Sequence, residues 1–365
     1  NGSNVTNWPL DMGGTAYRPS PVIADLDYNK SNGLELLMWQ PDQLYAFHAD
    51  GSSVSGWPVT APSVYGVVAP AVGDLDGNLQ DGQEVVVCGY SSSMYTDYLR
   101  VVHASGGVRW SKSLDTAGSD YCTSPIIAEF DGNAGNGKEV LVAGGPYGQY
   151  IYAWHADGTA LTNWPKDAGS DPFTGIAVAD LDQNTANGLE VVAVAGGPYG
   201  SSVYAWHLDG TDVAGWPISI GNNVETNPAI ADLDNNLGNG LEVIAMGING
   251  GPYGRVFYAW HADGNAVAGW PGDTSLSSTN GAPAVGDLDG NPLNGLEVVG
   301  CGSGYVYAIG ATGSVLPGWP VSRNCNTVAL ANLDGNPTNG LEVIVPDESI
   351  PNGVYVYHSD GSLFT

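Results

Sequence analysis

The chain has 365 residues, 43% of them hydrophobic, and carries 38 acidic side chains against 9 basic ones, for a formal net charge of −29. This charge argues against nucleic acids and anionic membrane surfaces as partners, because binding to phosphate requires clustered lysine and arginine. The sequence contains no stretch of about 18 apolar residues, so we expect no membrane insertion. The polar N-terminal residues carry no signal-peptide pattern, so we expect a secreted form to have lost its leader before residue 1.

An acidic loop recurs seven times along the chain, with few departures from the pattern D-x-D-x-N-x-x-N-G-x-E. The copies begin at residues 25, 74, 129, 180, 232, 287 and 332, so their spacing is 45 to 55 residues. Twenty of the 38 acids occupy the first, third and eleventh positions of these loops, which scattered surface charge would not do. A period of this size indicates a repeat architecture, and we expect a single domain over residues 1–365.

Each repeat predicts four short strands, as residues 227–271 illustrate. Small residues at 227–231 predict an innermost strand before the acidic loop, and the almost continuously apolar segment 241–246 predicts a strand covered on both faces. A third strand is expected at 256–261 and a fourth at 267–271, where a proline that cannot donate a backbone hydrogen bond favours an outer edge. Helical periodicity is missing and the chain has 53 glycines, so the predicted class is all-β.

Seven repeats of four antiparallel strands predict a seven-bladed β-propeller. One tryptophan per repeat supports this number, at Trp8, Trp57, Trp110, Trp164, Trp216, Trp270 and Trp319. The first of these precedes the first acidic loop and none follows the last. We therefore expect the N-terminal segment to supply the outer strand of the last blade and to close the ring. An open solenoid is the alternative, but its ends would need polar caps, and the sequence shows none.

The acidic loops offer the ligands that a hard cation prefers. Carboxylates at positions 1, 3 and 11, an amide oxygen at position 5 and a backbone carbonyl near position 7 would converge in a tight loop, and Ca²⁺ accepts about six to eight such oxygens. Mg²⁺ demands a stricter octahedron, and zinc or iron prefers His or Cys, which these loops lack. We therefore expect up to seven Ca²⁺ ions, one per blade. The candidate ligands are Asp25, Asp27, Asn29, Ser31, Glu35, Asp74, Asp76, Asn78, Gln80, Glu84, Glu129, Asp131, Asn133, Gly135, Glu139, Asp180, Asp182, Asn184, Ala186, Glu190, Asp232, Asp234, Asn236, Gly238, Glu242, Asp287, Asp289, Asn291, Leu293, Glu297, Asn332, Asp334, Asn336, Thr338 and Glu342.

The alternative for the same loops is a set of Asx turns without an ion, in which Asp and Asn side chains bond to their own backbone. Its weakness is electrostatic, since carboxylates within a few ångströms of one another repel by roughly 1 to 4 kcal/mol per pair. Two loops depart from the pattern at the first position, where Glu129 and Asn332 stand in place of Asp. The Asn332 loop loses a charge, so we expect it to be the weakest site.

The strand–acidic loop–strand repeat resembles the FG-GAP/VCBS repeats of the integrin α-subunit head and of secreted prokaryotic proteins, over the whole chain. Asp25, Asp27 and Asn29, with their equivalents in the other repeats, match the first three ligand positions of that family. Glu35 departs from it, because it comes two residues later than the last acid of the family and is not Asp. The resemblance implies a seven-bladed propeller with calcium between the first and second strands of each blade.

All six histidines share one position after the third strand, at His48, His103, His155, His207, His261 and His358. A residue that recurs in almost every repeat is expected to be structural, which argues against catalysis of the Ser-His-Asp type. Among the acids that do not repeat, Asp97, Asp347 and Glu348 form no recognisable catalytic constellation.

The four cysteines fall in two equivalent pairs. Cys88 and Cys301 end a second strand, whereas Cys122 and Cys325 begin the next first strand. These ends lie on the same side of adjacent blades, so we predict the disulfides Cys88–Cys122 and Cys301–Cys325, with four buried free thiols as the alternative. Disulfides, like calcium, favour an extracellular location, either secreted or at the cell surface. N-x-[S/T] glycosylation signals stand at Asn1, Asn4 and Asn29, the last of which is also a predicted ligand.

The hairpins between the second and third strands differ among repeats and are candidate ligand-binding loops. Three of them share the sequence Gly-Gly-Pro-Tyr-Gly, which places Tyr147, Tyr199 and Tyr253 on the side opposite the acidic loops. An exposed tyrosine is well suited to stack on a sugar ring or to contact a protein. The alternative is that these tyrosines only pack on the next blade.

Together these features predict an extracellular, calcium-stabilised, non-enzymatic module that binds a glycan or a protein at the cell surface. One alternative is a structural subunit of a fibre or surface layer that self-associates by passing its N-terminal strand to the next molecule. A second alternative is a propeller-type polysaccharide-active enzyme, which would require acids or bases that do not repeat. The fold alone does not decide among these functions.

Overall fold

The computed structural model describes residues 5, 7–10, 21–40, 43–60, 68–91, 96–114, 122–133, 135–145, 148–169, 173–197, 200–221, 226–248, 255–276, 280–302, 304–336, 338–347 and 353–364. By its internal contacts the chain divides into two compact units, Asn1–Pro172 and Phe173–Thr365. The first unit holds three antiparallel sheets and the second holds four.

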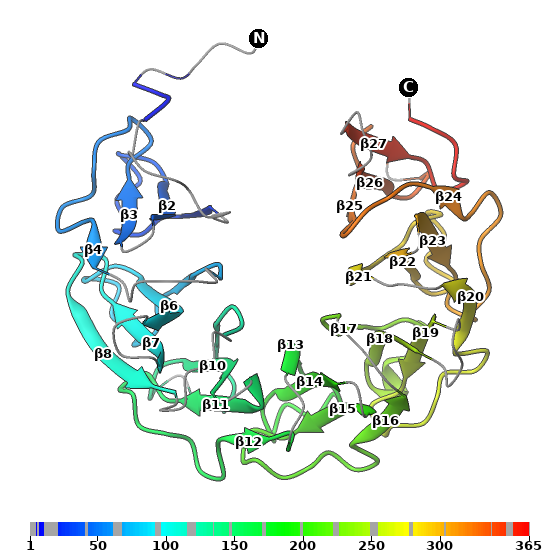
Figure 1. The fold of residues 1–365 in the computed structure, drawn as a ribbon, viewed down its shortest axis with the longest axis horizontal. Helices are drawn as coiled ribbons and strands as arrows, with labels where there is room; N and C mark the ends of the chain where they lie inside the picture. The colour runs from blue at the N-terminus through cyan, green and yellow to red at the C-terminus, as the bar shows by residue number, and fades with distance from the viewer. Residues whose placement is uncertain are drawn as a thin grey trace. The chain divides into compact units, whose positions relative to one another are not determined.

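The three sheets of the first unit each have four strands, which pair with one another in chain order (Figure 1). The strands are β1 (Val22–Ala24), β2 (Glu35–Gln40), β3 (Gln43–Phe47) and β4 (Val59–Thr60); β5 (Ala71–Gly73), β6 (Glu84–Ser91), β7 (Thr96–Val102) and β8 (Val108–Ser113); β9 (Ile126–Ala128), β10 (Glu139–Gly144), β11 (Tyr150–Trp154) and β12 (Lys166–Asp167).

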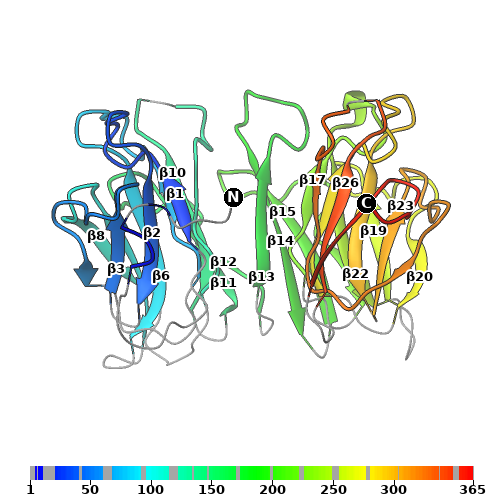
Figure 2. The same ribbon diagram turned by 90° about the horizontal axis from the view of Figure 1, so that it is seen from above.

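The second unit continues the same order in three four-stranded sheets and a last sheet with three strands in the described part of the chain. Figure 2 shows neighbouring strands such as β13, β14 and β15 side by side. The strands are β13 (Phe173–Ala179), β14 (Glu190–Gly197), β15 (Gly200–Trp206) and β16 (Ile218–Gly221); β17 (Ala229–Ala231), β18 (Glu242–Ile248), β19 (Arg255–Trp260) and β20 (Gly272–Leu276); β21 (Asn280–Gly286), β22 (Glu297–Gly302), β23 (Tyr305–Ile309) and β24 (Val321–Ser322); β25 (Ala329–Ala331), β26 (Glu342–Asp347) and β27 (Gly353–Tyr357). Within its described residues, the chain has no helix long and apolar enough to cross a membrane.

The prediction of the fourth strand was wrong, whereas the first three strands are confirmed in repeat 227–271 as β17, β18 and β19. The fourth strand, β20, begins after Pro271 instead of ending there. The preceding residues form a turn, in which Val267 N–H donates to Ala259 O at 3.0 Å and Trp270 N–H donates to Val267 O at 3.0 Å. These bonds use the donors that a strand would need for its own ladder, so the strand starts only beyond the proline.

The second strand contributes most to the core of each sheet, although β2 and β26 alternate buried with partly exposed residues. All six residues of β10 and all six of β22 are buried, as the continuous apolar pattern predicted. Side chains interlock between neighbouring sheets, where Val192 and Val194 of β14 cluster with Val243 and Ala245 of β18. Each such side chain contributes about 1.5 to 3 kcal/mol when fully buried, so the main stabilising contacts lie between sheets.

A tryptophan that follows the third strand joins each sheet to the next one in its unit. Trp57 Nε1 donates to Ala104 O at 2.6 Å, across the first two sheets. Equivalent bonds join Trp110 to Ala156, Trp216 to Ala262, Trp270 to Ala311 and Trp319 to Ser359. Trp8 makes the same contact with Ala49 O at 3.1 Å, so the N-terminal segment packs on the first sheet as the end of a preceding sheet would. Closure of the ring by this segment stays a prediction.

Both predicted disulfides are confirmed. Cys88 of β6 bonds to Cys122 ahead of β9, and Cys301 of β22 bonds to Cys325 ahead of β25. Each disulfide joins a sheet to the one that follows it in the same unit, and all four cysteines are used. Such bonds persist in oxidising compartments, which agrees with an extracellular location.

Candidate functional site

Each acidic loop connects the first strand of a sheet to the second. In the first sheet β1 ends before Asp25, and Glu35 is the first residue of β2. The eleventh-position glutamate begins the second strand in all seven sheets and is at most 1% exposed. Glu35 Oε2 accepts a hydrogen bond from Leu26 N at 2.8 Å, and the equivalent bond is 2.7 to 2.9 Å long in the other six loops. The glutamate therefore holds the loop backbone in place, a role that the sequence did not suggest.

The third and fifth positions of the loops form Asx turns. Asp27 Oδ1 accepts from Asn29 N at 3.0 Å, Asp27 Oδ2 accepts from Asn32 Nδ2 at 3.0 Å, and Asn29 Oδ1 accepts from Ser31 N at 3.2 Å. These are the local bonds that the ion-free alternative requires. Each of these oxygens has further lone pairs, however, so the turns also leave room for ligation of a cation.

Several loop oxygens are buried without a hydrogen-bond partner among the described residues. Four first-position acids show this, at Asp25 Oδ1, Glu129 Oε1, Asp180 Oδ1 and Asp287 Oδ1, as do four eighth-position amides, at Oδ1 of Asn32, Asn187, Asn239 and Asn339. A buried polar atom without a partner destabilises a fold by about 1 to 3 kcal/mol. The recurrence of such atoms at equivalent positions fits a bound cation. It also adds the eighth-position amide, which the sequence assigned only to the turn, to the candidate ligands.

The histidines that follow the third strand lie against these loops. His48 Nδ1 is 3.0 Å from Glu35 Oε1, and the equivalent distance is 2.9 to 3.6 Å in all six sheets that carry a histidine. The sixth sheet has Gly310 at this position, in the same backbone turn. The sequence predicted a structural role for the histidines but not their contact with the glutamates. The histidine and the glutamate recur at fixed positions of the repeat, and this shared recurrence was the signal from which the contact could have been predicted.

Burial raises the pKa of five of the eleventh-position glutamates, Glu84, Glu139, Glu190, Glu242 and Glu297. In Glu190 and Glu242 the histidine hydrogen bond and a backbone N–H oppose this effect in part. Glu297, in the sheet without a histidine, has its pKa raised by burial to about 7. Burial and the neighbouring Asp131 also raise the pKa of Glu129. Burial is the main cause of these shifts, and neighbouring carboxylates such as Asp131 and Asp289 add to it.

The second loop departs from the others because its eighth residue is Asp81, which cannot donate as asparagine does. Arg109 of β8 donates to Asp76 Oδ2 instead. Burial of Asp76 works in the opposite direction, but the bonds from Arg109 and from Asn78 N–H hold the pKa of Asp76 below its usual value. In this loop the positively charged guanidinium of Arg109 therefore lies beside the candidate metal site.

The structure brings the third-position and eleventh-position carboxylates together with the histidine. One ligand atom from each of Asp27, Glu35 and His48 lies within 4.8 Å of the others, and the third, fourth and fifth sheets repeat this group. In the second loop Asp81 joins Glu84 in the group. The imidazole Nδ1 faces the glutamate, so the histidine braces that side chain, and the remaining polar groups of the loop offer oxygens. An oxygen set of this kind fits Ca²⁺ better than zinc.

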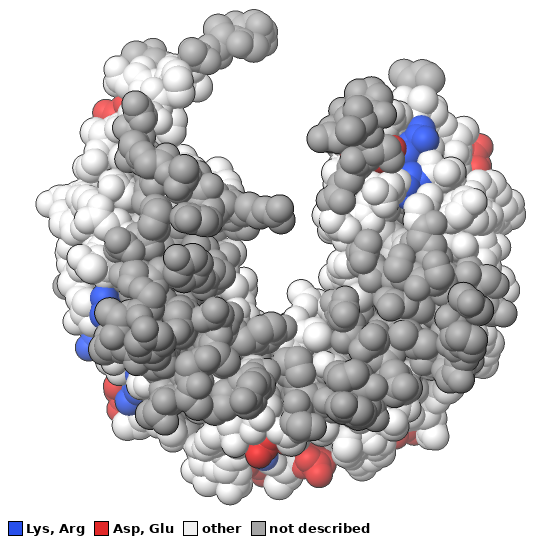
Figure 3. All heavy atoms as spheres, viewed as in Figure 1, with Lys and Arg blue, Asp and Glu red and all other residues white. Residues whose placement is uncertain are grey.

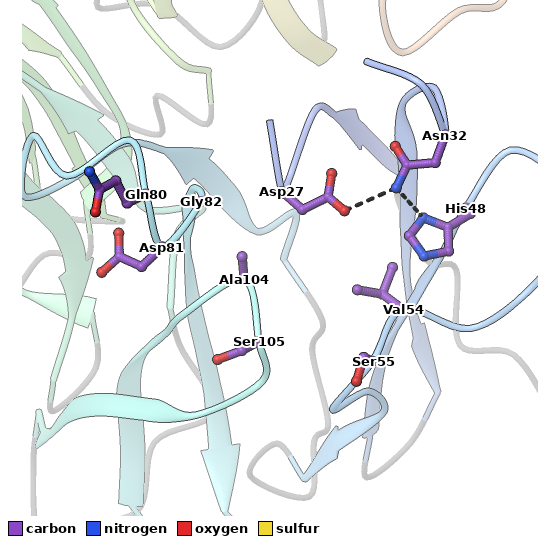
Figure 4. A pocket seen from close by; sticks show the side chains of 10 residues that line it. All are labelled: Asp27, Asn32, His48, Val54, Ser55, Gln80, Asp81, Gly82, Ala104 and Ser105. Carbon is purple, nitrogen blue, oxygen red and sulfur yellow. Dashed lines mark hydrogen bonds between the residues drawn. The ribbon is translucent and has the colours of Figure 1, made fainter. Parts of the chain in front are cut away.

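Two open hollows with mixed polar and apolar linings adjoin these loops in the first unit. The first has a volume of about 410 Å³, and Figure 4 shows Asp27, Asn32 and His48 lining it from the first sheet and Gln80 and Asp81 from the second. The second has a volume of about 510 Å³ and is lined by Asp76, Arg109, Gly135, Asn136, His155, Ala156, Asp157 and Thr159.

The predicted ligand-binding tyrosines, Tyr147, Tyr199 and Tyr253, lie outside the described residues, as do Asn1, Asn4 and Glu348. Among the acids that do not repeat, Asp347 is described and is nearly buried. It forms an ion pair with Arg323, whose Nε is 3.7 Å from Asp347 Oδ2. The sequence did not single out this arginine.

Successive antiparallel sheets of this form define the chain as an all-β protein of the propeller class, as predicted. No family model matches the sequence and no curated protein matches it, so membership of the FG-GAP/VCBS family is not shown. Solved structures that resemble the chain include a Bacillus licheniformis rhamnogalacturonan lyase, with TM-score 0.58 and 18% identity over 90% of this chain and 65% of that one. The exotype rhamnogalacturonan lyase YesX gives TM-score 0.60 and 16% identity over 92% of this chain and 65% of that one. The Dos1 propeller gives TM-score 0.51 and 11% identity over 85% of this chain and 72% of that one.

These neighbours contradict the prediction of a non-enzymatic binding or adhesion module. Two of them are polysaccharide lyases, which favours the enzyme alternative instead. The chain spans about 65% of the length of each lyase, and at these identities the likeness itself shows the fold. The prediction of a non-enzymatic module was wrong because it relied on finding catalytic acids and histidines in the sequence. Most of these residues belong to the repeated acidic loops and turns, so the sequence pattern mainly reports the fold.

Proposed function

We propose that this chain forms the propeller of an extracellular polysaccharide-active enzyme, a lyase that acts on an acidic glycan. The observation that supports this most is the structural likeness to two rhamnogalacturonan lyases over 90% and 92% of the chain. The two disulfides agree with action outside the cell, where such polymers occur.

We also propose that the acidic loops bind Ca²⁺, up to one ion in each. Support comes from the buried oxygens without partners and from the raised pKa of the loop glutamates. The first-position and third-position carboxylates and the fifth-position amide would hold the ion, while the eleventh-position glutamate shapes the loop. A bound ion would neutralise charge at the start of every core strand, and so stabilise the sheets on which a substrate site is built.

Incubation with defined polymers tests the lyase proposal. The purified protein, in buffer with Ca²⁺, is mixed with rhamnogalacturonan, polygalacturonan or a neutral galactan, and the products are examined by ultraviolet absorbance and mass spectrometry. A lyase leaves an unsaturated uronate end that absorbs ultraviolet light, whereas a hydrolase adds water and leaves none. We expect unsaturated products from an acidic polymer and none from galactan or from heat-denatured protein. Intact acidic polymers after incubation with folded, calcium-loaded protein would contradict the proposal.

A further inference from the structure

A basic and an acidic side chain in the second unit break the repeat together. Arg323 lies between β24 and β25, nine residues before the acidic loop, and none of the other six repeats has a basic residue at that position. Asp347 ends β26, five residues after the loop glutamate, and none of the other six repeats has an acid there. A pair that departs from the scaffold at two coordinated positions is a candidate for a function that the scaffold does not need.

The guanidinium of Arg323 is held in a fixed plane. Its Cζ lies 3.9 Å from the ring centroid of Tyr355 and 5.7 Å from that of Tyr357, both on β27. Nε is 3.7 Å from Asp347 Oδ2, and Nη1 donates to Ser322 O at 2.9 Å. Nε is buried on the side of Asp347, so the Nη end of the guanidinium is the part left to donate to a planar anion. The arginine is therefore pre-organised to accept a carboxylate.

The cluster is open to solvent and has an aromatic surface beside it. Arg323 keeps 29% of its side chain exposed. Tyr305, the first residue of β23, is 43% exposed and pairs with Ser322, the neighbour of Arg323. The disulfide from Cys325 anchors the segment that carries the arginine. An exposed tyrosine ring can stack on a sugar, and backbone pairing puts Tyr305 opposite the residue before Arg323, an arrangement that suits a sugar carrying a carboxylate.

The positive charge of Arg323 would favour an anionic ligand at this position. The chain has a net charge of −29, so an anionic polymer is repelled unless a positive group meets it locally. On the face of the molecule in Figure 3, Lys and Arg atoms form only a few small patches among the described residues. Arg323 is thus one of the few positive side chains in the described residues that an acidic glycan can meet, and it shares its charge with Asp347.

We propose that Arg323, Tyr305 and Tyr355 form a subsite for a uronate residue of an acidic polysaccharide. The guanidinium binds the carboxylate, Tyr355 orients the guanidinium, and Tyr305 stacks on the sugar ring. The subsite is at the opposite end of β26 from the acidic loop, because Glu342 begins that strand and Asp347 ends it. This inference rests on the proposed function and names its substrate class.

Calorimetric titration of the calcium-loaded full chain tests the subsite. The probes are a galacturonate trisaccharide, its methyl ester and a hexaglutamate peptide. We expect the trisaccharide to bind at least tenfold more tightly than its ester, which lacks the charge, and than the peptide, which lacks the sugar ring. Equal affinity for the trisaccharide and the ester would overturn the inference, and so would preferential binding of the peptide.

Variants locate the binding. Arg323→Gln alone leaves the nearly buried Asp347 without its cation, so the pair Arg323→Gln and Asp347→Asn is tested as well, with unfolding temperature as a check on the fold. The matched control is Arg100→Gln, which removes one charge from a partly exposed arginine in the first unit. We expect the folded double variant to lose at least tenfold in trisaccharide affinity and the control to lose less than twofold. Unchanged affinity in the folded double variant, or an equal loss in the control, would overturn the inference.

The same variants separate this inference from the proposed function. If the wild-type protein cleaves an acidic polymer and the double variant does so with unchanged KM, the lyase proposal stands and the subsite is wrong. If the wild-type protein binds the trisaccharide through Arg323 but cleaves no polymer, the subsite stands and the lyase proposal is wrong.

Discussion

His48 Nδ1 lies 3.0 Å from Oε1 of the buried Glu35, and six of the seven sheets have an equivalent pair. The other oxygen of each glutamate holds the backbone of the acidic loop. Each pair therefore links the end of the third strand to the loop before the second strand, and it partly neutralises a carboxylate at the base of the core. The sixth sheet retains the glutamate, Glu297, but has Gly310 in place of histidine.

Glu297→Gln is expected to stabilise the calcium-free protein at neutral and alkaline pH. Burial raises the pKa of Glu297 from 4.5 to about 7 in the folded state, so the folded protein binds this proton more tightly than the unfolded chain does. The resulting stabilisation is fully present below about pH 4.5 and is lost as the pH rises through about 7, a change on the order of 2 kcal/mol. Thermal unfolding in chelator should show that the advantage of the variant grows with pH.

Glu242→Gln is the matched control, because Glu242 Oε1 lies 2.9 Å from His261 Nδ1. The substitution removes a charged hydrogen-bond acceptor from the histidine, so it is expected to destabilise the same calcium-free protein by about 1 to 2 kcal/mol. A gain in stability equal to that of Glu297→Gln would show that the histidine does not compensate the buried carboxylate.

Removal of divalent ions is expected to lower the unfolding temperature of the wild-type protein. An ion present at about ten times its Kd contributes about 1.4 kcal/mol, and independent sites add. Re-addition of Ca²⁺ should restore the unfolding temperature, while Mg²⁺ should restore less of it. An unfolding temperature that stays the same once elemental analysis shows the ions to be gone would contradict the calcium sites.

Asn332→Asp is expected to strengthen the weakest of these sites. The substitution gives the last loop the first-position carboxylate that five other loops carry as Asp. Calorimetric titration of Ca²⁺ should show one site with a Kd lowered several-fold relative to the wild-type protein. Asn336 accepts a hydrogen bond from Thr338 N in the same loop, and Thr338→Ser retains that backbone donor, so it serves as a control that should leave the titration unchanged.

Arg109→Gln is expected to destabilise the first unit by about 1 to 3 kcal/mol, because it removes the charged donor to Asp76 Oδ2 beside the acidic Asp81. Asp81→Asn should restore most of that loss, since asparagine makes this bond at the eighth position of other loops, as in Asn136 to Asp131 at 2.8 Å. Thermal unfolding of both single variants and the double variant measures the coupling. Additive effects would mean that the arginine does not replace the amide.

Trp270→Phe is expected to lower the stability of the second unit by about 1 to 2 kcal/mol, because the buried Ala311 O loses the indole donor at 2.7 Å. Trp270→Ala should be worse, by about 3 to 5 kcal/mol, since it also removes a side chain that is 6% exposed from the contact between two sheets. Denaturant unfolding followed by far-ultraviolet circular dichroism measures both. Equal losses in the two variants would show that packing of the ring contributes nothing beyond its hydrogen bond.

Much of the fold follows from patterns that are local in the sequence. The apolar run at 241–246 predicted β18 because a strand covered on both faces needs no alternation of polar and apolar residues. The fourth strand was misplaced because the turn at Val267 depends on the carbonyl of Ala259, and Trp270 depends on Ala311 in the next sheet. The sequence of the turn does not indicate that the carbonyl oxygens of Ala259 and Ala311 accept these hydrogen bonds.

By itself the sequence determined the seven acidic loops, the buried second strands such as β10 and β22, and the pairing of Cys88 with Cys122, since each depends on position within a repeat. Only the tertiary structure placed His48 on Glu35 and Arg323 on Tyr355. These contacts join different strands through side-chain packing, and the spacing of residues along the chain does not encode the direction in which a side chain points.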